Sequence, residues 1–254
     1  MLSSAQIKEI RSLHLNKNRE SSGLFLVEGV KMVGELLKSA FKVRQIYGTE
    51  KWVKGLKLSK KADSPAIQSI SPSELGRISS LKTPNEVLAV VKIPEVNLTE
   101  SDFDGLTLML DRIADPGNLG TIIRIADWFG IKTIVCSPDT VEIYNPKVVQ
   151  ATMGSLFRVK VFYDELSNVI RSFAQSIPKY GALLDGENIY ARELPEKAVI
   201  IVGNESHGIS EEVKSLVDQP VMIPAVVSGA ESLNASVAAA VICSEFRRSF
   251  LSKL

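Results

Sequence analysis

The stretch LTLMLD, residues 106–111, restricts the fold of this chain more than any other. A nearly continuous apolar run of this kind is typical of a parallel strand that is buried on both faces. The following GNLGTIIRIADWFG predicts a helix that ends at Gly130, and IKTIVC predicts the next strand. Residues 106–136 therefore predict a βαβ unit, which indicates a parallel α/β sheet.

The rest of the chain extends this α/β pattern in both directions. After the βαβ unit, the segments GALLDG, AVIIVGN and QPVMIP predict further strands, and a long helix is expected over residues 233–250. Before it, helix and strand patterns alternate in a way that predicts a small α/β layer structure. Residues 97–105 are rich in acidic residues and lack an apolar period, which is typical of a linker. We therefore expect one domain over 1–96, a linker over 97–105 and a second domain over 106–254.

The charge of the chain is divided between these two parts. The net charge is +1, but residues 1–96 hold 16 Lys and Arg against 9 Asp and Glu, and the remainder holds 14 against 20. A basic first domain indicates contacts with phosphate groups. A solvated lysine-rich surface such as KWVKGLKLSKK explains the same composition equally well.

Composition and cysteine content exclude several classes of protein. No apolar stretch reaches the length that a bilayer span needs, and the N-terminus lacks a signal-peptide core, so we expect a cytoplasmic protein. The two cysteines, Cys136 and Cys243, lie in apolar surroundings and are expected to be reduced core residues. His14 and His207 are the two histidines, and no residues have the spacing of metal ligands, so we expect no metal.

Three loops follow predicted strands at the end of the sheet where α/β proteins bind ligands. They are DRIADPGNLGTIIR, VGNESHGIS and IPAVVSGAESLN, and the dinucleotide fingerprint G-x-G-x-x-G is absent from all three. In the last loop, Glu231, Ser232 and Asn234 come directly before the final helix. Helix capping needs one such side chain, so this helix start is also a candidate wall of a ligand site.

Three segments of the second domain together carry a family resemblance. DPGNLGTIIRIADWFG, LLDGENIY through IVGNESHGIS, and SLNASVAAAVICSEFRR resemble, in that order, the three signature motifs of the SpoU (TrmH) branch of the SPOUT superfamily of RNA ribose 2′-O-methyltransferases. The N-terminal IRSLHLNKNRESSGLFLVEGVKMVGELL resembles a substrate-binding domain with the fold of ribosomal protein L30e. The resemblance implies an L30e-like α/β domain followed by a SPOUT α/β domain with a parallel sheet and a C-terminal trefoil knot.

The resemblance implies S-adenosylmethionine as the methyl donor, held mainly by backbone groups of the second and third motif loops. In this chain the implied donor-binding residues are Leu183, Gly203, Asn204, Ile223, Ser232 and Leu233. A glycine at position 203 would permit close approach of the backbone, although a plain turn at the end of a strand also accounts for it.

The resemblance also implies the catalytic residues. Arg124 corresponds to the essential arginine of the family and is expected to hold the substrate phosphate and hydroxyl. A guanidinium stays protonated in proteins, so the acceptor of the hydroxyl proton is left open between a phosphate and a carboxylate. His207 is expected to be a loop substituent rather than a general base, although its near-neutral reference pKa keeps it among the candidates. The other catalytic positions implied by the motifs are Asn118, Glu205, Ser232 and Asn234.

The expected partners are RNA and a second copy of the chain. In the family the final helix packs against its twin, so the resemblance implies a homodimer. Lys17 and Arg19, together with Arg124, are candidate RNA contacts.

The predicted function is S-adenosylmethionine-dependent 2′-O-methylation of RNA, with ribosomal RNA, 23S above others, as the expected substrate. The alternatives are a non-catalytic RNA-binding or ribosome-assembly protein of the same fold and a transfer RNA 2′-O-methyltransferase. A small-molecule methyltransferase would leave the basic first domain without a purpose.

Overall fold

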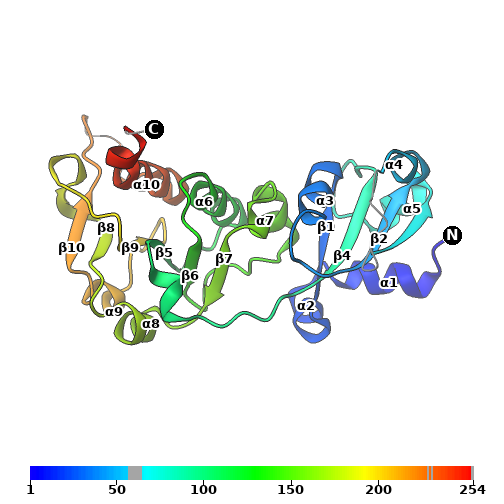
Figure 1. Cartoon of the computed structure of the whole chain (residues 1–254), viewed down its shortest axis with the longest axis horizontal. Helices are drawn as coiled ribbons and strands as arrows, with labels where there is room; N and C mark the ends of the chain where they lie inside the picture. The colour runs from blue at the N-terminus through cyan, green and yellow to red at the C-terminus, as the bar shows by residue number, and fades with distance from the viewer. Residues whose placement is uncertain (57–64, 228, 230, 253–254) are drawn as a thin grey trace. The chain divides into compact units, whose positions relative to one another are not determined.

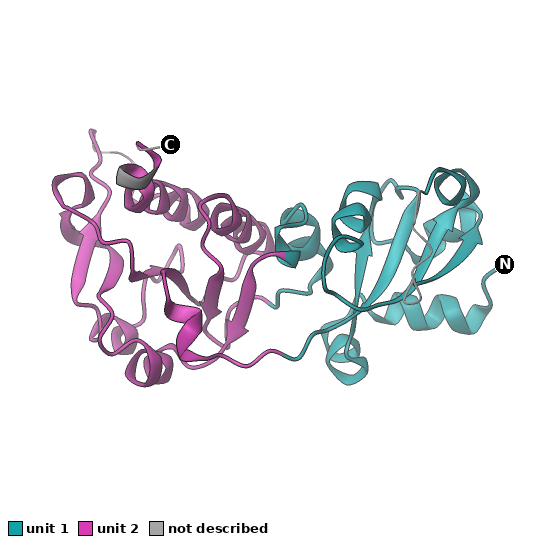
Figure 2. Cartoon of the chain, in the orientation of Figure 1, with its two compact units in different colours: residues 1–95, 142–157 teal, residues 96–141, 158–254 magenta. Residues whose placement is uncertain are grey.

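The computed structural model describes residues 1–56, 65–227, 229 and 231–252. The chain divides into two compact units, which Figure 2 colours separately. Unit 1 comprises Met1–Glu95 and Glu142–Phe157, and unit 2 comprises Val96–Val141 and Arg158–Leu254. Among the described residues, no helix combines the length and the apolar character needed to cross a membrane.

Unit 1 is built on a sheet of mixed direction. Its described strands are β1 (Leu24–Glu28), β2 (Val43–Thr49), β3 (Ala66–Ile70) and β4 (Val87–Lys92), in the order β1-β4-β2-β3 (Figure 1). β4 runs antiparallel to both neighbours, whereas β2 and β3 are parallel. Its helices are α1 (Ser4–Ser12), α2 (Asn16–Ser22), α3 (Val30–Leu36), α4 (Glu50–Gly55), α5 (Pro72–Ile78) and α7 (Pro146–Ala151), with a 3-10 turn, η2, at Ser155–Phe157.

Two apolar layers enclose this sheet. On one side, Ile7 and Ile10 of α1 join Leu75 and Ile78 of α5 in a single buried cluster with residues of β1 and β4. A separate aromatic group is centred on Phe25 of β1, whose ring lies 4.5 Å from that of Tyr144. The segment 142–157 therefore supplies part of the core of unit 1.

The structure differs from the predicted domain division at two places. Residues 142–157, which the sequence pattern assigned to the second domain, belong to unit 1. Residues 97–105, predicted as a linker, belong to unit 2 and contain the 3-10 helix η1 (Glu100–Phe103). Phe103 is 1% exposed, and Asp102 accepts a 2.8 Å hydrogen bond from Lys160, so this segment is part of the fold. The sequence pattern did not predict that this segment packs into the fold, because one buried aromatic residue in a short polar segment produces no hydrophobic periodicity.

Unit 2 is a parallel α/β structure, as the apolar strand pattern predicts. Its described strands are β5 (Leu106–Asp111), β6 (Thr133–Cys136), β7 (Lys160–Tyr163), β8 (Lys179–Asn188), β9 (Ala198–Gly203) and β10 (Gln219–Met222). All paired neighbours in the order β10-β8-β9-β5-β6-β7 are parallel. The helices are α6 (Pro116–Trp128), α8 (Leu166–Phe173), α9 (Glu211–Lys214) and α10 (Ala235–Leu251), with a 3-10 turn, η3, at Ile189–Ala191.

Helices cover both faces of this sheet (Figure 1). α6 and α10 pack together on one face, and α8 and α9 lie on the other, where they share a buried cluster with Met109, Val135 and Val199. α6 begins at Pro116 after the Asp115 cap and ends before Gly130, whose φ of +68° is the left-handed conformation typical of a helix end. The βαβ unit predicted over residues 106–136 is confirmed.

The two cysteines belong to the core of unit 2. Cys136 and Cys243 are free thiols with no exposed surface. Burial raises the pKa of the Cys243 thiol to about 12 and also raises that of Cys136. The expectation that both cysteines are core residues is therefore confirmed.

Candidate functional site

A cavity of about 520 Å³ opens in unit 2, where β9 and β10 end beside β8. Parallel sheets expose their loops at this edge, and small-molecule sites generally measure about 300–1,000 Å³. Its walls come from β8, from the loop after β9, from the segment between β10 and α10, and from the first turns of α10. The lining residues include Ala182–Asp185, Val202–Ile209, Glu211, Lys214, Val221–Ile223, Glu231–Leu233, Ala235, Ala238 and Ile242.

The loop after β9 is held in one shape by Asn204. The side-chain Nδ2 of Asn204 donates to the Arg112 carbonyl at 2.9 Å, and its Oδ1 accepts from the backbone N–H groups of Ser206 at 2.8 Å and His207 at 3.1 Å. A Cβ at Gly203 would lie 2.3 Å from the Gly208 backbone, so a glycine is required there. Gly208 has a φ of +64°, which also favours glycine. The loop is therefore pinned to the segment that precedes α6.

Asn118 joins all three motif segments. Its backbone N–H donates at 2.8 Å to the Asp115 carboxylate, which caps α6, and its side-chain Nδ2 donates to Glu205 in the loop after β9. The Asn118 Oδ1 in turn accepts a 3.0 Å hydrogen bond from Asn234 Nδ2. Three segments that lie up to 116 residues apart in the sequence are thus connected through one amide.

Asn234 is both a helix cap and a member of this network. Its Oδ1 accepts hydrogen bonds from the backbone of Ser236 at 3.0 Å and from the Ser236 hydroxyl at 2.6 Å. Because capping occupies only the oxygen of the amide, the nitrogen is free to reach Asn118. The two interpretations of this helix start, as a cap and as a site wall, are therefore compatible.

Arg124 lies on α6, two turns after Asn118, and its side chain is exposed. Within the described part of the chain, its guanidinium makes no hydrogen bond or ion pair. Its five donors are consequently available for a ligand that carries phosphate or hydroxyl oxygens.

Most of the charged side chains that line the cavity are acidic. Its lining holds four carboxylates, those of Asp185, Glu205, Glu211 and Glu231, and one ammonium group, that of Lys214. Lys214 Nζ lies 3.9 Å from the nearer oxygen of Asp185, in a pair whose lysine is partly exposed and whose carboxylate is largely exposed. An excess of carboxylates favours a cationic ligand.

The structure brings most of the residues predicted from the motifs to this cavity. The six predicted donor-binding residues all line it, and so does Glu205. Asn118 and Asn234 connect to Glu205 through the hydrogen bonds described above, whereas Arg124 remains an exposed side chain on α6.

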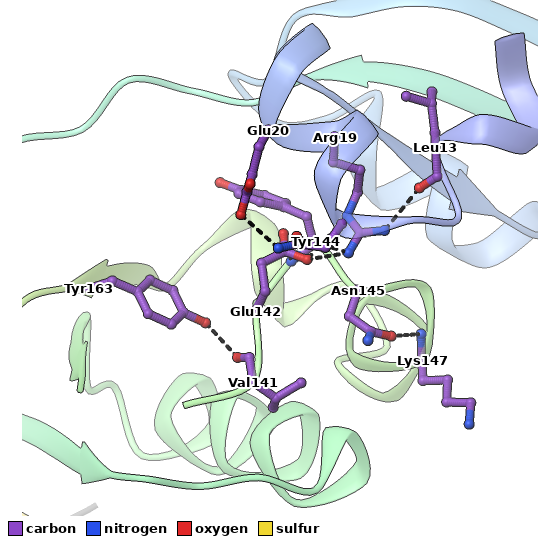
Figure 3. Close-up of polar contacts among 10 residues, drawn as sticks. Leu13, Arg19, Glu20, Val141, Glu142, Tyr144, Asn145, Lys147 and Tyr163 are labelled. Carbon is purple, nitrogen blue, oxygen red and sulfur yellow. Dashed lines mark hydrogen bonds and ion pairs between the residues drawn. The ribbon is translucent and has the colours of Figure 1, made fainter. Parts of the chain in front are cut away.

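The two predicted RNA contacts of unit 1 differ in their surroundings. Lys17 on α2 is exposed. Arg19 is 2% exposed, and its guanidinium donates to the Leu13 carbonyl at 2.9 Å and to the Glu142 carboxylate (Figure 3). The prediction that Arg19 contacts RNA is wrong for this conformation, because its donors are already paired in the interior. The sequence around Arg19 did not indicate this burial, because its carboxylate partner, Glu142, lies 123 residues away.

Sequence reasoning missed two charged residues of the cavity that lie outside the motif segments. Glu211 and Lys214 come from α9, a four-residue helix. The spacing of Glu211 and Lys214 by three residues places both on one side of a helix and could have indicated a shared environment. Among the described residues, no group of three or more His, Cys, Asp or Glu side chains is arranged to hold a metal ion.

Comparison with known proteins gives a consistent result. Residues 105–244, more than half of the chain, match the SpoU rRNA Methylase family, and residues 4–89 match the MRM3-like substrate binding domain. The chain is 32% identical to the 23S rRNA (guanosine(2553)-2′-O)-methyltransferase RlmP of Bacillus subtilis, over 95% of this chain and 96% of that protein.

Two solved structures match 98% of this chain. A TrmH-family protein from Porphyromonas gingivalis is 40% identical, with a TM-score of 0.89 over 98% of this chain and 99% of that chain. The SpoU methyltransferase AviRb from Streptomyces viridochromogenes, solved with AdoMet, is 26% identical, with a TM-score of 0.84 over 98% and 99%. The chain therefore belongs to the SpoU rRNA methylase family.

Proposed function

We propose that this protein transfers the methyl group of S-adenosylmethionine to a ribose 2′-hydroxyl of ribosomal RNA, with 23S RNA as the expected substrate. The observation that carries the proposal is the bridge through Asn118, which joins Glu205 and Asn234 beside the cavity. A helix cap alone would not need an amide that connects three loops. A binding protein without chemistry would not need an exposed Arg124 on α6 that has no hydrogen-bond or ion-pair partner among the described residues.

The cavity fits S-adenosylmethionine in size and in chemistry. Apolar side chains such as Leu183, Val202 and Ile242 provide a surface for an adenine ring, and the surplus of carboxylates suits a cationic sulfonium. The close packing at Gly203, where a Cβ would collide with the Gly208 backbone, brings main-chain groups to the cavity wall. When bound, the donor supplies an activated methyl group.

The residues of the chain would position the acceptor. Correct placement of two reactants contributes on the order of 7 kcal/mol or more to such reactions. Arg124 would hold the phosphate and ribose oxygens of the substrate, because a guanidinium binds such groups with paired hydrogen bonds. Asn118 would keep Glu205 and the start of α10 in fixed positions.

RNA recognition is assigned to unit 1 and to Arg124. Residues 4–89 match a substrate-binding domain, and residues 1–96 carry the basic charge of the chain. Lys17, which is exposed on α2, remains a candidate phosphate contact. We also propose cytoplasmic action, since ribosomal RNA is the expected substrate, and a trefoil knot in unit 2, since the family resemblance implies one.

A homodimer is part of the proposal. α6 and α10 pack against each other, and each exposes a large apolar side chain, Trp128 at 84% and Val237 at 48%. Exposed apolar side chains on adjacent helices are typical of association surfaces. Light scattering is expected to give a molar mass twice the 27.8 kDa of one chain. The Trp128→Asp variant is expected to have the mass of a single chain.

The test is methyl transfer to RNA from labelled donor. Ribosomal RNA and transfer RNA are incubated separately with the protein, and the product is digested with alkali, which cannot cleave the phosphodiester bond next to a 2′-O-methyl ribose. Labelled, alkali-resistant dinucleotides from ribosomal RNA, absent with Arg124→Ala, would support the proposal. If label appeared only in transfer RNA, the substrate would be transfer RNA instead of ribosomal RNA. If the protein bound RNA but transferred no methyl group, a ribosome-assembly protein would be favoured.

A further inference from the structure

We propose that Arg112 binds a phosphate group of the RNA substrate, close to the nucleotide that is methylated. The inference rests on the proposed methyl transfer and adds a second cationic contact to that of Arg124. Arg112 lies directly after β5, and its carbonyl accepts a hydrogen bond from Asn204, a residue that lines the cavity. Arg112 is therefore one contact removed from the cavity wall.

The backbone conformation of Arg112 is the first observation. Its φ of +58° lies in the left-handed region, which favours glycine and is costly for a residue with a long side chain. Two hydrogen bonds hold this conformation: the Arg112 N–H donates to the Ser137 hydroxyl at 2.8 Å, and the carbonyl accepts from Asn204 Nδ2 at 2.9 Å. Strained residues of this kind cluster at ligand sites.

These backbone contacts do not explain why residue 112 is an arginine. A glycine carries the same N–H and carbonyl groups and adopts a positive φ without strain, so it would make both hydrogen bonds at a lower cost. The reason for an arginine at this position therefore lies in its side chain.

The Arg112 side chain is anchored at its inner end and open at its outer end. Its Nε lies 3.4 Å from Asp111 Oδ1, and the other oxygen of that buried carboxylate accepts the Ser210 backbone N–H at 2.6 Å. Among the described residues, the two terminal nitrogens of Arg112 have no hydrogen-bond partner, and the side chain is 38% exposed. The terminal N–H groups are consequently available to a ligand.

The charge of the cavity explains why RNA needs a cation here. Four of the five charged side chains that line the cavity are carboxylates, which repel a polyanion. Arg112 follows β5 and Arg124 lies on α6, so the two arginines belong to the elements that the first motif loop joins. Together they would offset this repulsion where the substrate ribose must approach the donor.

Phosphate is the ligand class that fits this side chain. A guanidinium presents a planar fork of N–H donors that matches two phosphate oxygens. A ribose within an RNA chain has a phosphate on each side, so an RNA bound at the cavity brings such a group to its edge. Contacts of this kind set the position of the RNA and do not read its sequence.

The experiment measures the affinity of the full chain for ribosomal RNA at a series of salt concentrations. Arg112→Gln removes the charge and keeps the backbone strain. It should weaken binding roughly 10-fold or more, as loss of a hydrogen bond to a charged group does. The slope of log affinity against log salt should become shallower by about 0.7–0.9, the contribution of one phosphate contact. Arg112→Lys, which keeps the charge, should retain the slope.

A matched control is available at the opposite edge of the same sheet. Lys197 precedes β9 and forms an exposed ion pair with Asp104, at the end of the parallel strands remote from Arg112. Lys197→Gln removes one positive charge, as Arg112→Gln does, and should change neither the affinity nor the slope. An equal effect of both variants would reduce the role of Arg112 to net charge and overturn the inference.

Two further measurements separate a phosphate contact from a structural role as counter-ion of Asp111. Arg112→Gly relieves the strain, so it should melt at a higher temperature than Arg112→Gln and still bind RNA as weakly. A lower melting temperature of Arg112→Gln with an unchanged salt slope would overturn the inference. A loss of affinity for S-adenosylmethionine in calorimetry, with RNA binding unchanged, would overturn it as well.

Failure of this inference can be told from failure of the proposed function. If the unaltered protein transferred methyl groups but had the same salt slope as Arg112→Gln, the function would stand and the phosphate contact would fall. If the slopes differed as expected but no methyl group was transferred, the phosphate contact would stand and the proposed function would fall.

Discussion

Two arginines of this chain, Arg19 in unit 1 and Arg124 in unit 2, have opposite surroundings. Arg19 is 2% exposed, and its guanidinium is bound by Leu13, Asn16 and Glu142. Arg124 is exposed and has no hydrogen-bond or ion-pair partner among the described residues. A buried guanidinium must be paired because its desolvation is costly. An unpaired one on the surface costs little and is available for a ligand.

The carboxylates of the two units follow the same contrast. Glu28 of unit 1 is 6% exposed and accepts hydrogen bonds from Ser79 and from the backbone and hydroxyl of Ser80, the latter two at 3.0 and 2.6 Å. Glu205 of unit 2 is bound by Asn118 and also lines the cavity. Closed polar networks stabilise a fold, whereas networks that border a cavity position a ligand.

The largest effect on stability is expected from Arg19→Ala. Removing one partner of a buried pair leaves the other unpaired, which costs about 3–5 kcal/mol of unfolding free energy. Urea unfolding followed by circular dichroism measures this loss. Methyl transfer per folded molecule should stay unchanged, because Arg19 lies in the core of unit 1.

The double variant Arg19→Met with Glu142→Leu provides the control. Replacing both charges with apolar side chains should recover much of the stability lost in Arg19→Ala. If Arg19→Ala kept its stability but lost RNA binding, Arg19 would instead be a contact of the RNA substrate.

Arg124→Ala should show the reverse pattern. We expect methyl transfer to fall by roughly 10²–10³, the loss that follows removal of one positioned donor in other active sites. The melting temperature should not change, because the side chain is exposed and unpaired among the described residues. Arg124→Lys should restore little activity, since an ammonium cannot make paired hydrogen bonds to phosphate. A fall in melting temperature parallel to the fall in rate would contradict this division of roles.

Asn118→Ala is expected to have a smaller effect on activity. The variant loses the hydrogen bonds to Glu205 and Asn234, each of which contributes about 0.5–1.5 kcal/mol or somewhat more for the charged partner, so a loss of roughly 10- to 100-fold in rate follows. Asn118→Asp should lower the rate further, because it places a second carboxylate against Glu205. The cap of α6 remains, since Asp115 supplies it through the backbone of residue 118. Equal rates for all three proteins would show that the bridge has no role in the reaction.

The sequence predicted the βαβ unit of β5, α6 and β6 because its signals are local. The apolar strands, the Asp115 cap and Gly130 each act within a few residues, and the observed α6 lies between them. The donor-site positions followed from motifs that fall at strand ends, where a parallel sheet gathers its loops.

The remaining features depend on contacts between distant segments. Nothing near Arg19 in the sequence indicates that Glu142 will pair with it, and nothing near Tyr144 indicates that it will pack on Phe25. Asn118 was predicted from its motif position, but its bridge to Glu205 and Asn234 needs the fold to bring three loops together. Composition and periodicity contain no information on such pairings.

The smallest expected effect concerns acid stability in unit 1, where Glu74 is another fully bonded carboxylate. Hydrogen bonds from the backbone of Ser71 and Leu2, and from the Ser71 hydroxyl, lower the pKa of Glu74 from 4.5 to about 2. A depressed pKa stabilises the folded state above pH 4.5, and this contribution is lost as the pH falls toward 2. In urea unfolding at stepped pH, Glu74→Gln should therefore lose less stability than the unaltered protein over that interval, and Ser71→Ala should lie between them. An identical pH dependence in all three proteins would show that the Glu74 carboxylate contributes nothing to acid stability. The hydrogen bonds that Glu74 accepts from Ser71 and Leu2 would then be dispensable for the stability of unit 1.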